Sequence, residues 1–213
     1  MNENVKVKVL LVNGSPHENG CTYTALCEVA KALNETGVET EIFQLGKRAV
    51  GGCMGCGACA KLGKCVTDDI VNEFTKKAAE FDGFVFGSPV YYAAPAGALL
   101  AFMDRTFYSG GKNFAYKPAA AVASARRAGT VATFDVLNKY FTINNMHVVS
   151  ANDWNGVHGA NGKSEDVLKD EEGLQTMRIL GNNMAWLLKC LKLGEAEGIA
   201  PKKENKIRTN FIR

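Results

Sequence analysis

The stretch KVKVLLVNGSPHENGCTYT, from Lys6 to Thr24, decides the fold expected for this chain. Its first half is a short, almost uninterrupted apolar run, which is typical of a strand covered on both faces, as in a parallel sheet. The turn NGSP at 13–16 ends this strand, and Thr22 can cap the helix that follows. Such a turn is an anion site, because free backbone N–H groups and the positive end of the helix dipole point at it.

The residues of this turn indicate which anion it would bind. The spacing of Gly14, Gly20 and Thr22 resembles a P-loop, but the lysine that reaches the outer phosphates of a nucleoside triphosphate is missing. The turn also lacks the G-x-G-x-x-G pattern of a dinucleotide site. Hydroxyls and amides without a lysine suit a single terminal phosphate, such as that of FMN. The alternative is a strand–helix connection that merely uses Gly and Ser as turn residues.

Length and composition suit one α/β domain, since the chain has 213 residues and 46% of them are hydrophobic. No apolar run approaches the roughly 20 residues that span a bilayer. No signal-peptide pattern follows the polar N-terminus at 1–4. We therefore expect a cytoplasmic protein that makes no contact with a membrane.

Charge is dispersed along the chain, with a net charge of +3, until the C-terminal tail. We expect a single domain over residues 1–196 and a basic tail over 197–213. A solvated tail, or an arm that packs on a neighbouring subunit, fits this aromatic-poor segment better than a nucleic-acid patch. The basic residues of the tail are Lys202, Lys203, Lys206, Arg208 and Arg213.

Further along the chain, short apolar runs alternate with segments of helical periodicity, and Asp68 or Asp69 can cap one of the helices. Right-handed crossovers build five such strands and five helices into a doubly wound parallel sheet. Ligands of these sheets bind beyond the carboxyl ends of the strands, so the loops 14–22, 88–95 and 124–129 should converge on one ligand. After the first strand and helix, the predicted strands are 39–44, 84–86, 119–123 and 146–149, and the predicted helices are 70–81, 98–107, 130–141 and about 172–192.

Two of these loops carry residues suited to a flat ring. The loop at 88–95 is stiffened by two prolines, and Tyr91 and Tyr92 give it planar surface. Alternatively, these tyrosines simply pack the loop. The third loop offers Arg126 and Arg127, and a guanidinium near a flavin pyrimidine would stabilise the anionic reduced flavin. The alternative for the arginines is solvated surface charge.

Four of the seven cysteines form a C-x2-C-x2-C-x5-C pattern at Cys53, Cys56, Cys59 and Cys65. The odd total and the lack of an export signal argue against a disulfide framework. Two-residue gaps let consecutive thiolates surround one metal centre, and four cysteines without a nearby histidine suit iron–sulfur or zinc. The tandem spacing favours a [4Fe–4S] cluster over zinc. Alternatively, these are reduced thiols, or a disulfide formed in air.

The combination of GSPHENGCT, CMGCGACAKLGKCVTDD, GSPVYY, MDRTFYSGGKNFAYK and ARRAG resembles the iron–sulfur flavoproteins and the related NAD(P)H-dependent FMN reductases. The resemblance covers roughly Lys6 to Lys192. It implies a flavodoxin-like three-layer sandwich with a five-stranded doubly wound parallel sheet of order 2-1-3-4-5, and FMN as cofactor. It also implies a homodimer or homotetramer in which the cysteine loop at 51–68 approaches a neighbour's flavin.

The same resemblance assigns site residues. Family members commonly have Asn where Cys21 stands, which is harmless if only the backbone N–H of this position is used. The residues implied to contact FMN are Ser15, His17, Cys21, Thr22, Pro89, Val90, Tyr91, Tyr92, Arg126 and Gly129, and those implied to hold a cluster are Cys53, Cys56, Cys59 and Cys65.

We therefore predict an FMN-dependent oxidoreductase that takes electrons from NAD(P)H or a reduced carrier. It would pass them to a quinone, flavin, nitro or similar small-molecule acceptor or to a redox partner protein, by way of a [4Fe–4S] cluster if one is present. The flavin supplies the chemistry, so no side-chain acid or nucleophile is required. The alternatives are a non-enzymatic flavodoxin-like electron carrier and a cysteine-based redox sensor.

The segment DWNGVHG at 153–159 is not explained by the predicted sheet and is expected to be a long loop. Its Trp154 and His158 are suited to cover a flavin. Alternatively, Trp154 anchors the loop to the core and His158 is an exposed loop residue.

Overall fold

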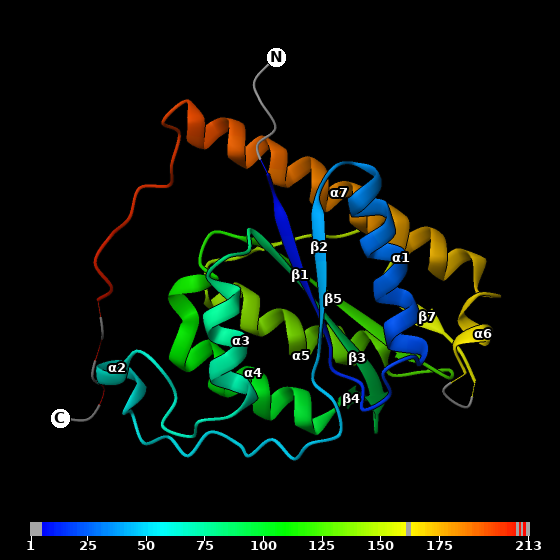
Figure 1. The fold of residues 1–213 in the computed structure, drawn as a ribbon, viewed down its shortest axis with the longest axis horizontal. Coiled ribbons are helices and arrows are strands. Elements are labelled where there is room, and N and C mark those ends of the chain that lie inside the picture. The colour runs from blue at the N-terminus through cyan, green and yellow to red at the C-terminus, as the bar shows by residue number, and fades with distance from the viewer. Residues whose placement is uncertain (1–5, 161–162, 208, 210, 212–213) are drawn as a thin grey trace.

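The apolar runs of the sequence assemble into one sheet in the computed structural model, which describes residues 6–160, 163–207, 209 and 211. Five strands pair in parallel in the order β2-β1-β3-β5-β6 (Figure 1). Counted along the chain these are the five predicted strands, so the predicted order 2-1-3-4-5 is confirmed. The short β4 pairs antiparallel with β3, and the short β7 pairs with the end of β5. The strands are β1 (Lys8–Asn13), β2 (Glu39–Gln44), β3 (Gly83–Tyr91), β4 (Ala94–Pro95), β5 (Pro118–Ala125), β6 (His147–Val148) and β7 (Gly156–His158).

Helices cover both faces of the sheet and make a three-layer sandwich (Figure 1). On one face α1 packs against α7, and on the other face α3, α4 and α5 lie over a second core. The helices are α1 (Cys21–Glu35), α2 (Cys59–Leu62), α3 (Ile70–Ala78), α4 (Gly97–Gly110), α5 (Thr130–Ile143), α6 (Ser164–Val167) and α7 (Glu171–Ala196), with a 3-10 turn η1 at Gly111–Asn113.

The alternating side chains of β1 explain why this strand is apolar at nearly every position. Val9 and Leu11 are fully buried in the core shared with α1 and α7, whereas Leu10 and Val12 are fully buried under the opposite helices. A strand covered on both faces has no solvated side, so it needs apolar residues at successive positions. Each such burial contributes roughly 1.5–3 kcal/mol to folding.

Phenylalanine rings fill the core under α3, α4 and α5. The ring centroid of Phe74 on α3 lies 5.0 Å from that of Phe43 on β2 and 4.9 Å from that of Phe102 on α4, both edge-to-face. This geometry adds to the stabilisation that comes from burial alone. Phe74 therefore fixes α3, the helix that follows the cysteine loop, against both the sheet and α4.

The beginnings of two helices test the predicted caps. Asp69 caps α3 by accepting a hydrogen bond from the backbone N–H of Val71 at 3.1 Å, which confirms one of the two predicted capping residues. The predicted cap at Thr22 is wrong, because α1 begins at Cys21 with Gly20 at the cap position. Thr22 lies inside the first turn, where its hydroxyl faces β5 instead.

Several elements differ in length from the prediction. β3 does not end at Phe86, because Gly87, Ser88 and Pro89 continue the parallel pairing with β5. The segment 153–159 is not a loop throughout, since Gly156–His158 forms β7. α3 ends at Ala78 rather than 81, and α7 continues past 192 to Ala196.

The tail after Ala196 has no helix or strand over its described residues 197–207, 209 and 211. It runs toward the region of α2 (Figure 1), and the Nζ atom of Lys203 lies 5.6 Å from the ring centroid of Tyr116. The tail thus contacts its own chain. Arg208 and Arg213, and the polar N-terminus at 1–4, lie outside the described residues.

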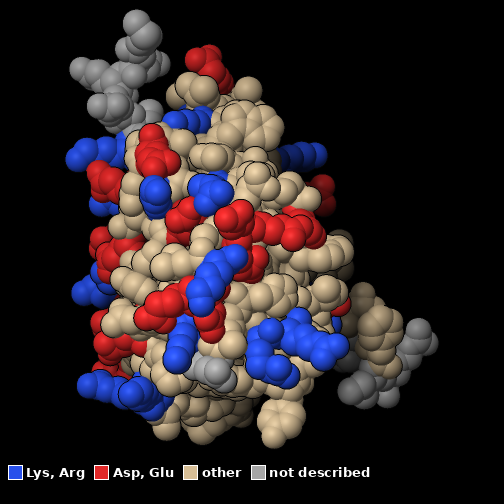
Figure 2. Space-filling view, turned by 90° about the vertical axis from the view of Figure 1, so that its right-hand side faces the viewer, with Lys and Arg blue, Asp and Glu red and all other residues tan. Residues whose placement is uncertain are grey.

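Acidic and basic side chains are interspersed over the face that carries α6 and the start of α7 (Figure 2), in keeping with the dispersed charge of the sequence. None of the helices in the described part of the chain is long and apolar enough to cross a membrane.

Candidate functional site

The turn after β1 is held by Asn13, whose side chain is fully buried. Its amide donates to the backbone oxygen of His17 at 3.2 Å and to Oε1 of Gln44 at 2.6 Å, and its Oδ1 accepts from the backbone N–H of Ser15 at 3.2 Å. Gln44 in turn donates to the backbone oxygen of Ser15 at 2.8 Å. These bonds tie the turn to both β1 and β2, so its shape is fixed before α1 begins.

Gly14 brings this turn against β3. Its backbone N–H donates to the carbonyl of Gly87 at 2.9 Å, and a Cβ atom at this position would stand 2.7 Å from that oxygen. Only glycine permits this approach. The loops after β1 and β3 are therefore in contact at the carboxyl edge of the sheet.

The three loops that were predicted to converge surround one cavity of about 260 Å³, here called the three-loop cavity. The loop at 124–129 was predicted to reach the ligand, but Ser124 and Ala125 were not among the predicted site residues. Gly159 was not predicted either, because only the pairing of β7 with β5 brings it to this edge. The described lining of the cavity consists of the predicted Ser15, His17, Cys21, Thr22, Pro89, Val90, Tyr91 and Arg126, together with Gly20, Ser124, Ala125 and Gly159.

Thr22 and Ser124 form the floor of this cavity. Their hydroxyl oxygens lie 2.7 Å apart, and both residues are buried. The bond joins the first turn of α1 to the end of β5. Thr22 therefore positions the helix N-terminus rather than capping it.

Cys21 presents a neutral thiol next to the helix N-terminus. Burial raises the pKa of this thiol; its backbone N–H opposes the shift, and the negative charges of Asp166 and Glu165 add to it. The Sγ atom donates to the backbone oxygen of Lys163 at 3.3 Å. An uncharged sulfur does not repel an anion bound at the neighbouring backbone amides.

The loop after β3 folds into a tight hairpin. Val90 and Tyr91 pair with Pro95 and Ala94, and the two residues of the turn, Tyr92 and Ala93, both have positive φ, 51° and 57°. Two-residue hairpin turns with this backbone usually contain Gly or Asn, so the turn is strained.

The hairpin separates the two predicted tyrosines. Tyr91 lines the three-loop cavity, whereas Tyr92 lies at the tip of the hairpin, fully exposed and outside the lining. Gly129 also lies outside the lining. A Cβ atom on Gly129 would stand 2.8 Å from Val90 and 2.9 Å from Ala93, so this glycine supports the hairpin from behind.

The charges around the three-loop cavity favour an anion. Its described lining includes the positively charged Arg126 and no Asp or Glu, and His17 adds ring nitrogens that can donate hydrogen bonds. Among the described residues no side chain caps α1, so the amides of its first turn are open to an external acceptor. Arg127 is exposed and does not line the cavity.

A second cavity of about 460 Å³, here called the cysteine cavity, contains all four predicted ligand residues in its wall. Cys53 and Cys56 are exposed, and Cys59 and Cys65 are half-buried. Within the described residues, no three His, Cys, Asp or Glu side chains are gathered tightly enough to hold one metal ion. The thiols thus face a common space without meeting at a single point.

Arg105 on α4 closes the back of the cysteine cavity, and sequence reasoning missed its role. Its side chain is only 2% exposed and forms a two-bond ion pair with Asp69, at 2.7 and 2.8 Å. Its Nε–H donates to Sγ of Cys65 at 3.3 Å. Burial alone would raise the pKa of the Cys65 thiol, but hydrogen bonds from Arg105 and the backbone N–H of Thr67 outweigh it, and the pKa is lowered. The sequence signal was an arginine that follows Asp104 in a largely apolar helix.

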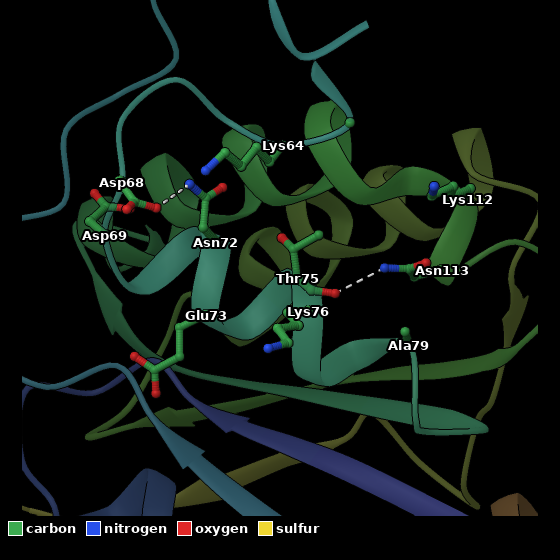
Figure 3. Close-up of a pocket in the computed structure, with 11 residues that line it drawn as sticks. Lys64, Asp68, Asp69, Asn72, Glu73, Thr75, Lys76, Ala79, Lys112 and Asn113 are labelled. Atoms are coloured by element: carbon green, nitrogen blue, oxygen red, sulfur yellow. Dashed lines mark hydrogen bonds between the residues drawn. The ribbon is translucent and has the colours of Figure 1, made fainter. Parts of the chain in front are cut away.

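Residues of α3 form part of the wall of a third, larger hollow of about 670 Å³ (Figure 3). Lysine side chains and carboxylates both contribute to its wall (Figure 3). Asn72 points toward Asp68 and donates to its Oδ1 at 2.9 Å, and Asn113 donates to the backbone oxygen of Thr75 at 2.9 Å (Figure 3). These polar groups bond to one another instead of converging on a common point, so the hollow is a weaker candidate than the two cavities above.

The two singled-out residues of segment 153–159, Trp154 and His158, lie outside the lining of the three-loop cavity. Trp154 is 66% exposed, so the proposed role as a core anchor is wrong. His158 is exposed; its backbone N–H donates to Oδ2 of Asp170 at 2.6 Å, and Asp170 also caps α7. Neither side chain covers the cavity of its own chain.

A doubly wound sheet of this order, with a cavity at its carboxyl edge over a helix N-terminus, defines the flavodoxin-like class of α/β proteins. Solved structures of low identity show the same fold. A flavodoxin from the domain Archaea superposes with a TM-score of 0.59 at 15% identity, over 86% of this chain and 99% of its own. A flavone reductase superposes with a TM-score of 0.67 at 17% identity, over 87% and 64%.

Sequence comparison gives the family. The family of NADPH-dependent FMN reductases matches residues 7–161, and this chain belongs to it. An iron-sulfur flavoprotein of Methanocaldococcus jannaschii is 34% identical over 195 residues, which cover 87% of this chain and 100% of the relative. An iron-sulfur flavoprotein of Methanosarcina thermophila is 27% identical over 190 residues, which cover 87% and 97%. The resemblance inferred from the motifs is thereby confirmed.

Proposed function

We propose that this protein is an oxidoreductase that binds FMN in the three-loop cavity. It would take electrons from NAD(P)H or a reduced carrier and pass them to a quinone, flavin, nitro compound or similar acceptor. When bound, FMN supplies the redox chemistry by accepting two electrons and releasing them together or singly. The chain's own residues bind the cofactor, orient it and adjust its electrostatic surroundings.

The observation that carries this proposal is the uncapped N-terminus of α1 beside a turn already fixed by Asn13 and Gln44. Open amides, the Ser15 hydroxyl and the positive helix end together suit a terminal phosphate. The flat isoalloxazine ring would lie along Pro89 to Tyr91, on the hairpin that borders the same cavity. Arg126 would face the ring and favour its anionic reduced form.

The cysteine cavity suits a [4Fe–4S] cluster by the chemistry of its donors. Four thiols line it, Gly55 and Gly57 turn the chain between them with positive φ, and the buried Arg105 donates a hydrogen bond to the sulfur of Cys65. In such a cluster each cysteine binds a different iron, so the four sulfurs need not meet at one point. We propose that Cys53, Cys56, Cys59 and Cys65 hold this cluster in a cytoplasmic homodimer or homotetramer.

The test is an absorbance spectrum with iron and acid-labile sulfide analysis on anaerobically purified protein. We expect flavin peaks with about four iron atoms per chain, and oxidation of NADH or NADPH once an acceptor is added. Flavin without iron would leave an FMN reductase and remove the cluster from the proposal. No flavin, together with no uptake of added FMN, would overturn the assignment of the three-loop cavity.

The two adjacent tyrosines provide a matched pair for this site. Tyr91→Ala should raise the Kd for FMN about tenfold, the loss expected for one aromatic contact of about 1.4 kcal/mol. Tyr92→Ala should leave the Kd unchanged, because Tyr92 lies outside the lining. Equal Kd values for both variants would contradict the placement of the ring along the hairpin.

A further inference from the structure

Arg105 uses every hydrogen-bond donor that it has, and all of them go to the two ends of the cysteine loop. An arginine side chain has five N–H groups. One donates to Sγ of Cys65, two to the carboxylate of Asp69, one to the backbone oxygen of Thr67 at 3.0 Å and one to that of Gly51 at 3.3 Å. A single buried side chain therefore closes the loop over residues 51–69.

Cys65 is also held through its backbone. Its N–H donates to Oδ1 of Asn72 at 3.0 Å, and its carbonyl accepts from Nδ2 of the same residue at 3.0 Å. Asn72 belongs to α3 and Arg105 to α4, so two packed helices fix this one cysteine. Within the described part of the chain, no hydrogen bond holds Cys53 or Cys56, which follow glycines on an exposed segment.

In the cysteine cavity, Cys65 is thus fixed by its neighbours, whereas Cys53 and Cys56 have no such restraints from the described residues. A bond from a charged donor to a ligating sulfur stabilises added negative charge on a cluster, and such bonds are known to adjust its reduction potential. The guanidinium is nearly inaccessible to solvent, so water screens its charge little, and the paired carboxylate of Asp69 offsets part of it. Arg105 is therefore placed to act on electron uptake as well as on the shape of the loop.

We propose that Arg105 is a positioning residue that fixes Cys65 as the anchor of the cysteine loop and raises the reduction potential of the cluster held there. This inference rests on the proposed function for its second half, the potential. Its first half, the positioning of the loop, can be tested without iron. Asp69 serves both halves, because it holds the guanidinium in place and caps α3 at the same time.

The first experiment is an anaerobic redox titration of the iron-loaded protein, followed by electron paramagnetic resonance, for wild type, Arg105→Gln, Arg105→Lys and Arg178→Gln. Arg178 is the control, since it pairs with Glu28 between α7 and α1 on the other face of the sheet. At a fixed potential we expect the ratio of reduced to oxidised cluster in Arg105→Gln to fall at least tenfold, which is about 59 mV for a one-electron couple. Arg105→Lys keeps the charge but not the planar guanidinium group, so its reduction potential should lie between those of wild type and Arg105→Gln.

An Arg105→Gln protein with the potential of Arg178→Gln would overturn the proposal. If Arg105→Gln purifies without iron, the Arg105→Lys protein decides. A potential lower than that of wild type supports the proposal. Loss of iron from Arg105→Lys, while Arg178→Gln keeps its iron, supports it as well. An unchanged potential in Arg105→Lys overturns it in that case.

The second experiment uses metal-free protein and trypsin, which can cut after the exposed Lys61 and Lys64 within the loop. In Arg105→Gln we expect cleavage at these lysines to be at least tenfold faster than in wild type. Cleavage in the tail at Lys202 and Lys203 should not change and serves as the internal control. Equal loop cleavage in the two proteins would overturn the positioning role.

The two experiments separate the two possible failures. Wild-type protein that holds no iron would defeat the proposed cluster, and the trypsin comparison would then decide the positioning role by itself. If wild type holds iron and the potential of Arg105→Gln is unaltered, the proposed function stays intact and this inference is defeated.

Discussion

The hydroxyl oxygens of Thr22 and Ser124 lie 2.7 Å apart in the floor of the three-loop cavity, where the two residues are 1% and 5% exposed. The bond connects the first turn of α1 to the end of β5, two elements separated by about a hundred residues in the sequence. It therefore links the turn proposed to hold phosphate with the loop that carries Arg126.

Removing both members of this pair should cost less than the sum of the two single removals. Thr22→Val keeps the shape but leaves the Ser124 hydroxyl buried without its partner, at a cost of about 1–3 kcal/mol in the free energy of unfolding. Ser124→Ala should cost a similar amount, and the double variant should cost at least about 0.5 kcal/mol less than the sum. Urea unfolding of the four flavin-free proteins measures this, and strictly additive costs would show that the bond contributes nothing.

The sequence predicted the features of this site that follow from local rules. The apolar run of β1, the turn that ends it and the Asp69 cap each depend on neighbouring residues and elementary geometry. The convergence of the three loops followed from the topology of parallel sheets, which brings the carboxyl ends of strands to one edge. The order of the strands came from the resemblance to a family, and the structure confirms it.

The features that sequence reasoning missed all depend on contacts between distant segments. Thr22 looked like a cap because its type and position fit one, but its hydroxyl is used by Ser124 across the sheet. Arg105 looked like one of two adjacent charges in a largely apolar helix, and only folding brings it to Cys65. The turn residues Tyr92 and Ala93 are neither Gly nor Asn, the residues typical of such a tight turn, so local rules could not predict the hairpin.

Arg126 and Arg127 provide a test of local charge on the bound flavin. Arg126 lines the three-loop cavity and Arg127 does not, although both are exposed and adjacent. Arg126→Gln should lower the two-electron midpoint potential of FMN by about 10–30 mV, since a tenfold change corresponds to about 30 mV. The shift should shrink in high salt because the side chain is exposed. Equal shifts in Arg127→Gln, measured by dye-coupled redox titration, would point to net charge rather than to position.

The raised pKa of Tyr140 predicts that the stability of the folded protein falls at alkaline pH. Burial raises the pKa of this phenol, and the hydrogen bond that it donates to Asp104 at 2.5 Å, together with the charge of that carboxylate, raises it further. The folded pKa exceeds the unfolded value of 10.0, so the contribution to stability is complete below pH 10 and is lost as the pH rises through the folded pKa.

Above pH 10 ionisation of Tyr140 in the unfolded chain should therefore lower the free energy of unfolding. The slope of this contribution stays below the limit of about 1.4 kcal/mol per pH unit, because the unfolded phenol is only partly ionised near its pKa. Tyr140→Phe should show a flatter slope between pH 10 and 11. Tyr108→Phe is the matched control, because Tyr108 lines the same pocket between α4 and α5 as Tyr140 but is 74% exposed. Unfolding in urea at stepped pH compares the three, and parallel slopes in wild type and Tyr140→Phe would contradict the assignment.

The hairpin after β3 stores strain that a single substitution should release. Ala93 has a φ of 57°, a left-handed conformation that costs a residue with a Cβ atom roughly 1–2 kcal/mol and costs glycine nothing. After the greater entropy of glycine in the unfolded chain is subtracted, Ala93→Gly should stabilise the protein by about 0.5–1 kcal/mol. Ala94→Gly, at the neighbouring position in β4, should destabilise it by a similar amount, because Ala94 is in a strand.

Thermal unfolding of both variants, with and without FMN, also shows what the strain does. If the hairpin is held in this shape to support the flavin ring, Ala93→Gly should keep its gain in stability without FMN but bind FMN more weakly, because the looser turn must be ordered again on binding. Unchanged affinity in the stabilised variant would show that the strained turn is only a structural connection between β3 and β4. A loss of stability without FMN would show that the methyl group of Ala93 contributes more through packing than the strain costs.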